Sequence, residues 1–351
     1  MFVNDSVSKL KLLGWSPFFQ QQLSLEEFDS LIAGRLIEQH RSKLIVASAR
    51  GNETVNMPSQ FEQICVGDWV LFDETNKVIR VLERKSLFQR KTPGSGVSTQ
   101  LIAANIDKVM IVCSLNNDFN LSRIERYLAI AKEAYVEPIV ILTKADQCED
   151  VEDKLEQIQT LDVNITCHSL NALEQSEIKQ LEQHYSLGST IAFMGSSGVG
   201  KSTLINGLLG HQALKTSAIR ENDSKGRHTT TFRTLKVLPQ GGILMDTPGM
   251  RELQLVDCEQ GISETFSEIT ALAKQCAYRN CSHSSEPNCA IQRAIEEGSV
   301  STRRFNSFQK LLKEQAFNSA TLYEKKAKEK AFCKMVNRVQ KATKNHKKGA
   351  N

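Results

Sequence analysis

The sequence predicts an α/β fold with a mostly parallel sheet, preceded by a small β-barrel and followed by a helical segment that binds a metal. Three observations lead to this fold class. Short apolar runs alternate with segments of helical spacing, which is typical of a parallel sheet covered by helices. A glycine-rich loop directly follows one apolar run, and three cysteines gather around a histidine near the end of the chain.

The first hundred residues have the pattern of a small β-barrel. Residues 1–32 are weakly informative, with 10–15 as a candidate cap for a neighbouring domain. Short β-type runs at 44–47, 66–72 and 77–82 are separated by polar turns, which predicts an OB-fold. A basic, glycine-containing stretch at 91–96 is expected to be a flexible linker. The first predicted domain, an N-terminal extension with an OB-fold barrel, therefore covers residues 1–100.

The second predicted domain covers residues 101–255 and contains the parallel sheet. Its expected strands are 109–113, 138–142, 191–194 and 243–245, with a helix at 121–134. Ligands bind at the carboxyl ends of such strands, where the motif loops of this chain lie. No strand is evident after residue 252, so a helical metal-binding domain is expected at 256–323 and a basic tail at 324–351.

Residues 195–202 match the phosphate-loop pattern G-x-x-x-x-G-K-[ST] in full. The glycines let backbone N–H groups and a helix N-terminus face the negative phosphates. Lys201 is expected to reach the β- and γ-phosphates during catalysis, and Ser202 to bind Mg²⁺. Asp246 opens a D-x-x-G switch and is expected to contact Mg²⁺, while the N–H of Gly249 senses the γ-phosphate. The predicted phosphate-side residues are Gly195, Ser196, Ser197, Gly198, Val199, Gly200, Lys201, Ser202, Thr203, Asp246 and Gly249.

A second loop is predicted to select the base, and it consists of Thr143, Lys144, Ala145 and Asp146. The Asp146 carboxylate can accept hydrogen bonds from guanine N1–H and the exocyclic amine together, a donor pair that adenine lacks. Thr143 stands where an Asn is usual, which is expected to loosen the loop while leaving the Asp146 contact intact. The alternatives are a chance glycine-rich turn and an ATP-specific loop; the intact switch and Asp146 argue against them.

The order of these motifs is informative, because the base loop precedes the phosphate loop. A GTPase domain normally closes with the base loop, whereas here that loop opens the domain. We therefore expect a circularly permuted GTPase that ends just after its second switch, with the γ-phosphate sensor connected directly to the segment that follows.

The catalytic group is less clear from the residues. Met250 follows Gly249 where many GTPases have a Gln that orients water, and a methionine cannot do this. His228, in the first switch, is the nearest candidate for contacting that water. Arg227 is an alternative, as a group that stabilises charge. The competing interpretation of His228 is a surface histidine in a mobile loop. Among residues 229–231, Thr230 is favoured for completing the Mg²⁺ shell.

Three thiols and one imidazole lie within a short polar segment, at Cys276, Cys281, His283 and Cys289. This set suits a closed, tetrahedral Zn²⁺ site with a structural role. The segment between them has almost no core of its own and needs a metal to hold it. Four unrelated residues are the alternative. The other cysteines are scattered along the chain and are interpreted as ordinary apolar side chains.

Charge and length restrict the possible partners. Ten of the 44 Lys/Arg and two of the 40 Asp/Glu lie between 321 and 351, which gives the tail a net charge of +8 and the rest −4. For the charge of the tail, two interpretations remain equally open: a polyanion binds it, or it is a solvated terminus. For a helix within the tail, two interpretations are also open: it binds RNA, or it docks on its own protein. No export signal and no membrane-spanning run are evident, so a cytoplasmic protein with reduced thiols is expected.

Together these motifs resemble the RsgA (YjeQ) family of circularly permuted GTPases. The resemblance includes the Gly-Arg-His-Thr-Thr-Thr stretch at 226–231, the switch at 246–249, the Cys/His set, and residues 99–107. It implies a cytoplasmic enzyme that hydrolyses GTP to GDP, binds the small ribosomal subunit and its rRNA late in assembly, and is activated by that subunit. It also maps the catalytic histidine of the family onto His228. We expect a monomer when the protein is off the ribosome.

Two other classes of function stay open at this stage. One is a GTP-gated RNA-binding assembly module with little turnover of its own. The other is a zinc-dependent nucleic-acid protein with a vestigial GTPase domain, which the intact phosphate motifs disfavour.

Overall fold

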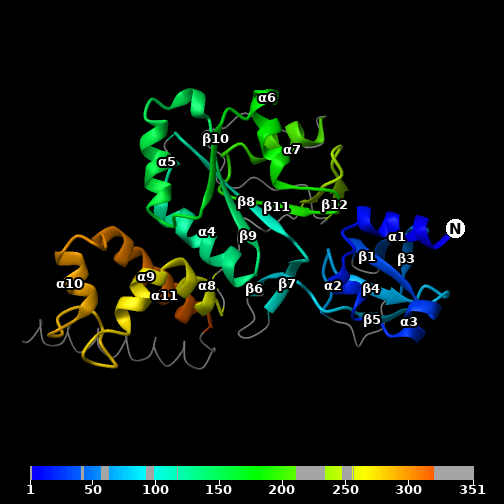
Figure 1. Ribbon diagram of the computed structural model, residues 1–351, viewed down its shortest axis with the longest axis horizontal. Helices are drawn as coiled ribbons and strands as arrows, with labels where there is room; N and C mark the ends of the chain where they lie inside the picture. Colours follow the sequence, from blue (N-terminus) through cyan, green and yellow to red (C-terminus); the bar gives the residue numbers. More distant parts are fainter. Residues whose placement is uncertain are drawn as a thin grey trace, which may run out of the picture.

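A computed structural model describes residues 2–40, 43–56, 63–91, 99–116, 118–210, 234–246, 255 and 257–319. Figure 1 shows three parts: the N-terminal strands at one end, a central sheet with helices, and a helical C-terminal part at the other end. Residues 92–96 of the predicted linker at 91–96, the first switch with His228 and Thr230, Gly249, Met250 and the predicted tail at 324–351 lie outside the described residues.

Three helices and five strands form the N-terminal part: α1 Phe2–Leu12, α2 Pro17–Gln20, α3 Leu25–Ser30, β1 Ile32–Gln39, β2 Leu44–Ser48, β3 Gly51–Val55, β4 Trp69–Phe72 and β5 Val78–Val81. The strands pair in the order β3-β2-β1-β4-β5. A parallel bridge between Asn56 and Lys77 brings the two ends of that order together. This pairing is compatible with the predicted OB-fold barrel, an assignment that stays a prediction.

A hairpin connects this part to the central sheet. It pairs β6 Leu87–Lys91 with β7 Thr99–Ala104 in antiparallel register. The predicted boundary between residues 100 and 101 falls inside β7. The connection is thus made of paired strands on either side of the segment 92–98.

The central sheet has the predicted strands at its core. In spatial order these are β10 Thr166–Leu170, β9 Glu137–Thr143, β8 Lys108–Ser114, β11 Thr190–Met194, β13 Ile243–Asp246 and β12 Thr234–Val237. All neighbouring pairs are parallel except β12 with β13. The strands β8, β9 and β11 are almost continuously buried, which is why their sequences are unbroken apolar runs.

Helices cover both faces of this sheet (Figure 1). They are α4 Leu121–Glu133, α5 Val151–Gln159, α6 Gln175–Ile178 with the 3-10 turn η3 Lys179–His184, and α7 Lys201–Leu209. One apolar core lies between the sheet and α4, and a second lies between the sheet and α6 and α7. Asn120 caps α4 by accepting a hydrogen bond from the backbone N–H of Arg123.

Two strands of the central sheet were not predicted from the sequence, and neither were β1, β3, β6 and β7 outside it. The edge strand β10 is half-buried and carries polar residues, so it lacks the apolar run of its neighbours. The short strand β12 pairs with β13 and, through Thr234 opposite Glu38, with β1. This second pairing joins the N-terminal strands and the central sheet into one continuous sheet.

The C-terminal part is helical, as predicted, with no strand among residues 257–319. It consists of α8 Glu259–Thr265, α9 Ser267–Ala273, α10 Ala290–Glu296 and α11 Thr302–Ser319. Its helices share the apolar core of α4. The fully buried Glu125 of α4 receives hydrogen bonds from Arg303 and Arg304 of α11, so an ion-pair cluster fastens this part to the sheet domain.

No helix in the described ranges combines the length and the apolar character that crossing a bilayer requires.

Candidate nucleotide site and metal centre

The phosphate loop lies between the buried strand β11 and the first turn of α7. Gly195, Gly198 and Gly200 have φ values of 144°, 80° and 93°, which side-chain-bearing residues rarely adopt. A Cβ on Gly195 would also lie 2.2 Å from the carbonyl oxygen of Val112. The glycines predicted to shape the loop are therefore required by its geometry.

Lys201 begins α7 and turns its ammonium group into the loop. The side chain is buried, and Nζ donates to the carbonyl oxygen of Gly195 at 2.6 Å and to that of Ser196. Ser202 and Thr203 follow in the same first turn and are half-buried. The helix N-terminus and the lysine thus converge at one place, which is the arrangement that binds a polyphosphate.

The base loop lies beside the phosphate loop and is bonded to it. Thr143 ends β9 and is fully buried, with its hydroxyl 2.7 Å from the carbonyl oxygen of Val199 and 3.3 Å from that of Cys113. This contact differs from the expected loosening, because the threonine hydroxyl ties the two loops together.

The remaining residues of the base loop are less buried than Thr143. Lys144 has a left-handed backbone with φ of 59° and is half-buried, as is Ala145. Asp146 lies in the 3-10 turn η2 Ala145–Gln147, and its side chain is exposed. Its carboxylate is therefore open to a base at the carboxyl edge of the sheet.

A third loop at this edge was missed by the sequence analysis. Leu170 ends β10 directly opposite Thr143 in the strand register, so Asn171 emerges next to the base loop. The side chain of Asn171 accepts a hydrogen bond from the backbone N–H of Leu173 and fixes the turn. The Asx-type turn after Leu170 was the signal available in the sequence.

Asp246 ends β13, the strand beside β11. Its backbone thus reaches the same edge as the phosphate loop, and its side chain lies outside the description. Gly249, His228 and Thr230 also lie outside it, so their predicted roles stay predictions.

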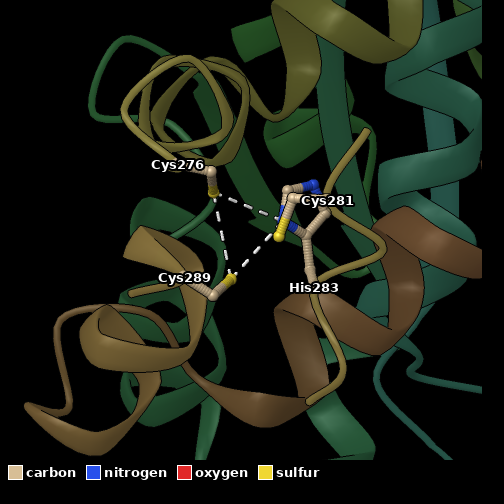
Figure 2. A group of neighbouring side chains, drawn as sticks. All are labelled: Cys276, Cys281, His283 and Cys289. Carbon is tan, nitrogen blue, oxygen red and sulfur yellow. Dashed lines mark hydrogen bonds between the residues drawn. The ribbon is translucent and has the colours of Figure 1, made fainter. Parts of the chain in front are cut away.

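The four predicted metal ligands come together in the C-terminal part (Figure 2). Their ligand atoms all lie within 4.8 Å of one another. The Nδ1 atom of His283 is 3.5 Å from Sγ of Cys276 and 3.5 Å from Sγ of Cys289, and these two sulfurs are 3.9 Å apart. Three thiols and an imidazole nitrogen gathered in this way fit a four-coordinate metal ion.

Backbone donors and a carboxylate shape the metal cluster from outside. Burial opposes ionisation of Cys276, but backbone N–H groups of Ala290 and Ile291 bring the pKa of its thiol below the ordinary value. The Glu286 carboxylate accepts from the backbone N–H groups of Ser282 and Ser284 and orders the turn between the ligands. Thiolate character is what a metal ion requires of its cysteine ligands.

None of the eight described cysteines forms a disulfide bond. The described part of the chain is therefore consistent with the expected use of its cysteines as free thiols and metal ligands.

Comparison with known proteins gives consistent results. The family model for the RsgA GTPase matches residues 81–256. The small ribosomal subunit biogenesis GTPase RsgA 2 of Vibrio parahaemolyticus is 54% identical over 330 residues, covering 94% of this chain and 92% of that protein. The RsgA protein of Mesorhizobium japonicum is 42% identical and covers 90% and 93%.

Two solved structures resemble the fold. YjeQ from Thermotoga maritima has a TM-score of 0.59 and 25% identity, covering 80% of this chain and 99% of its own. YloQ, described as a circularly permuted GTPase, has a TM-score of 0.56 and 20% identity, with coverage of 83% and 96%; at this identity the likeness concerns the fold alone. The permuted order of the loops agrees with the description of YloQ, and the chain belongs to the RsgA GTPase family.

Proposed function

We propose that this GTP-hydrolysing enzyme binds the small ribosomal subunit and its rRNA and assists late maturation of that subunit. The observation that carries the proposal is a phosphate loop and a base loop, bonded to each other, on a sheet that is bonded to both flanking parts. Arg35 of β1 donates to Thr190 Oγ1 at the start of β11, the strand that leads into the phosphate loop. Glu125 of α4 binds the C-terminal part. The names of the relatives, which describe small-subunit biogenesis GTPases, support the same role.

Guanine selection is assigned to the base loop. The exposed Asp146 carboxylate accepts from the two guanine donors, and the half-buried Lys144 stem lies along the ring. The turn at Asn171 closes the base pocket from the neighbouring strand, since Leu170 and Thr143 are opposite each other.

A magnesium ion is expected with GTP, bound by Ser202, Asp246 and Thr230. The position of Ser202 in the first turn of α7 and of Asp246 at the end of β13 supports this set. When bound, the ion would neutralise negative charge on the phosphates. Lys201 holds the β- and γ-phosphates, so that water can attack the γ-phosphorus and release GDP and phosphate.

The metal of the C-terminal cluster is proposed to be one structural Zn²⁺ per chain. The set Cys276, Cys281, His283 and Cys289 matches the ligands that zinc prefers and leaves no position for a substrate. The ion would stabilise a surface that contacts rRNA rather than take part in hydrolysis.

The protein is proposed to act in the cytoplasm, as a monomer when off the ribosome. The tail, with its net charge of +8, adds phosphate contacts to rRNA in this proposal. Truncation after Leu322 would then weaken subunit binding and reduce its salt dependence.

The competing function is a GTP-gated RNA-binding module with little turnover. Multiple-turnover hydrolysis with and without purified small subunits separates the two, together with sedimentation of the protein with subunits in GDP, GTP and a non-hydrolysable analogue. Isolated protein should turn over at roughly 10⁻⁴ to 10⁻² s⁻¹, and subunits should accelerate it by about 10³-fold or more. Nucleotide-dependent co-sedimentation without acceleration would favour the binding module.

His228 is the proposed group that the subunit orders near the attacking water. His228→Ala should retain nucleotide affinity and subunit binding but lose most of the stimulated rate, because the contact forms only near the transition state. Arg227→Ala is the matched variant. Stimulated turnover of His228→Ala within a few-fold of wild type would instead assign the role to Arg227 or to the ribosome.

A further inference from the structure

Side chains of α4 contact the phosphate loop, and none of them has a part in the function described so far. Arg123, in the first turn of α4, donates from Nη1 to the hydroxyl oxygen of Ser196 at 2.8 Å. The same guanidinium forms an ion pair with Asp118. The hydroxyl of Tyr127, one turn further along α4, is also hydrogen-bonded to Ser196.

Ser196 occupies a position where its contacts decide the shape of the loop. It follows Gly195 and lies two residues before Gly198, and both glycines have positive φ. Glycines permit many backbone conformations, so the loop between them is held by the contacts of its other residues. Lys201 donates a hydrogen bond to the carbonyl oxygen of Ser196, and Arg123 of α4 donates one to the Ser196 hydroxyl. The contact of Ser196 with α4 is therefore made by its side chain.

The position of Arg123 is not explained by stability alone. The Oδ2 atom of Asp118 is buried and has no hydrogen-bond partner among the described residues. Burying an acceptor without a partner is unfavourable. The ion pair is only half-buried, and the guanidinium reaches past the carboxylate to the hydroxyl of Ser196. Buried polar atoms without partners occur preferentially at functional sites. Asp118 is linked to the phosphate loop through Arg123.

We propose that Arg123 is a positioning residue for the phosphate loop: it holds Ser196, so that the backbone N–H groups of the loop are oriented for the phosphates before nucleotide arrives. This inference rests on the GTP site described above. The contact is made to the loop itself, so it serves the substrate and the transition state equally. Such uniform binding changes KM and leaves kcat unchanged.

The test is a mutant cycle on the full-length protein, with GTP and GDP affinities measured by fluorescent nucleotide analogues. Arg123→Ala and Ser196→Ala should each weaken both nucleotides by about tenfold, the usual loss for one hydrogen bond to a charged group. In the Ser196→Ala background, Arg123→Ala should change affinity by no more than about twofold, because its partner atom is already gone. In Arg123→Ala the loss should appear in KM and not in the single-turnover rate at saturating GTP.

The matched control is Arg126→Ala. Arg126 lies on the same helix and pairs with Glu314 at 2.9 Å, with comparable exposure, so this variant removes an arginine–carboxylate pair that does not contact Ser196. It should bind nucleotide like wild type. Arg123→Lys, which offers one donor nitrogen for two partners, should fall between wild type and Arg123→Ala.

Several outcomes overturn the inference. Unchanged affinity in both single variants would do so, as would effects of Arg123→Ala and Ser196→Ala that multiply in the double variant. If Arg123→Ala is too unstable for binding assays, the test uses Ser196→Ala and Asp118→Asn instead. Wild-type nucleotide affinity in both of these variants rejects the proposal. Failure of the wild-type protein to bind GTP would reject the nucleotide site instead.

Discussion

The nucleotide site and the metal cluster are built in opposite ways. The phosphate loop extends from β11, which is buried along its whole length and flanked by β8 and β13. The metal cluster lies in residues 276–289, of which only Cys289 is buried. The first site is held by a sheet with its own apolar core, whereas the second has four ligand side chains and little core.

This difference shows where the folding free energy of each site comes from. Apolar burial in the sheet stabilises the phosphate loop, at about 25 cal/mol per Å² of apolar surface. The cluster has little such surface within 276–289, so a bound metal would have to supply most of its stability. Loss of the metal should therefore unfold the cluster, whereas loss of the nucleotide should leave the phosphate loop folded.

Metal removal should have the largest effect. Cys281→Ser should lose the metal and unfold residues 276–289, because metal binding supplies roughly 10–16 kcal/mol at sites of this kind. Elemental analysis and hydrogen exchange measure the two results. Cys148→Ser, which changes a half-buried thiol outside the cluster, is the control. Stoichiometric zinc in Cys281→Ser, or no zinc in the wild type, would contradict the assignment.

The next largest effect is expected where the two regions meet. Glu125→Ala leaves Arg303 and the nearly buried Arg304 without their shared carboxylate. Breaking a buried ion pair in this way should cost about 3 kcal/mol or more. Denaturant unfolding measures this loss in the free energy of unfolding. The control is Glu314→Ala, which removes a partly exposed pair and should cost less than about 1 kcal/mol. Equal losses would show that burial of Glu125 is unimportant.

A smaller effect, confined to the nucleotide site, is expected from Asp146→Asn. The amide cannot accept from the guanine N1–H and amine as a carboxylate does, and it can donate to the C2 oxygen of xanthine. GTP affinity should fall by about 10²-fold while XTP becomes the preferred nucleotide. Melting temperature should be unchanged because Asp146 is exposed. A variant that still prefers GTP over XTP, or an equal loss in Asp150→Asn, would reject the role of Asp146.

The smallest effect is expected from Thr143→Val, which keeps the shape and removes the hydroxyl bonded to Val199. An unpaired carbonyl oxygen should cost about 1–2 kcal/mol, and nucleotide binding should weaken a few-fold because the two loops are no longer tied. Thermal unfolding and nucleotide titration measure these changes, with the half-buried Thr166→Val of β10 as control. If Thr143→Val matches wild type, the bond between the loops is unimportant.

Much of the site was predictable because its signals are local in the chain. The phosphate loop, the base loop and the Cys/His cluster were each predicted from residue type and spacing within a few positions, and the buried strands before them from unbroken apolar runs. The strand β10 was missed because an edge strand that is half-buried has no such run. The turn at Asn171 was missed with it.

The sequence by itself determined the order of the motifs, the strands that carry them and the ligands of the metal cluster, because each depends on neighbours along the chain. Only the tertiary structure decided the bond from Thr143 to Val199, the contact of Arg123 with Ser196 and the pairing of Glu125 with Arg304. These partners are 56, 73 and 179 residues apart. Contacts at such separations follow from how the sheet and helices pack, and no local pattern of residues encodes them.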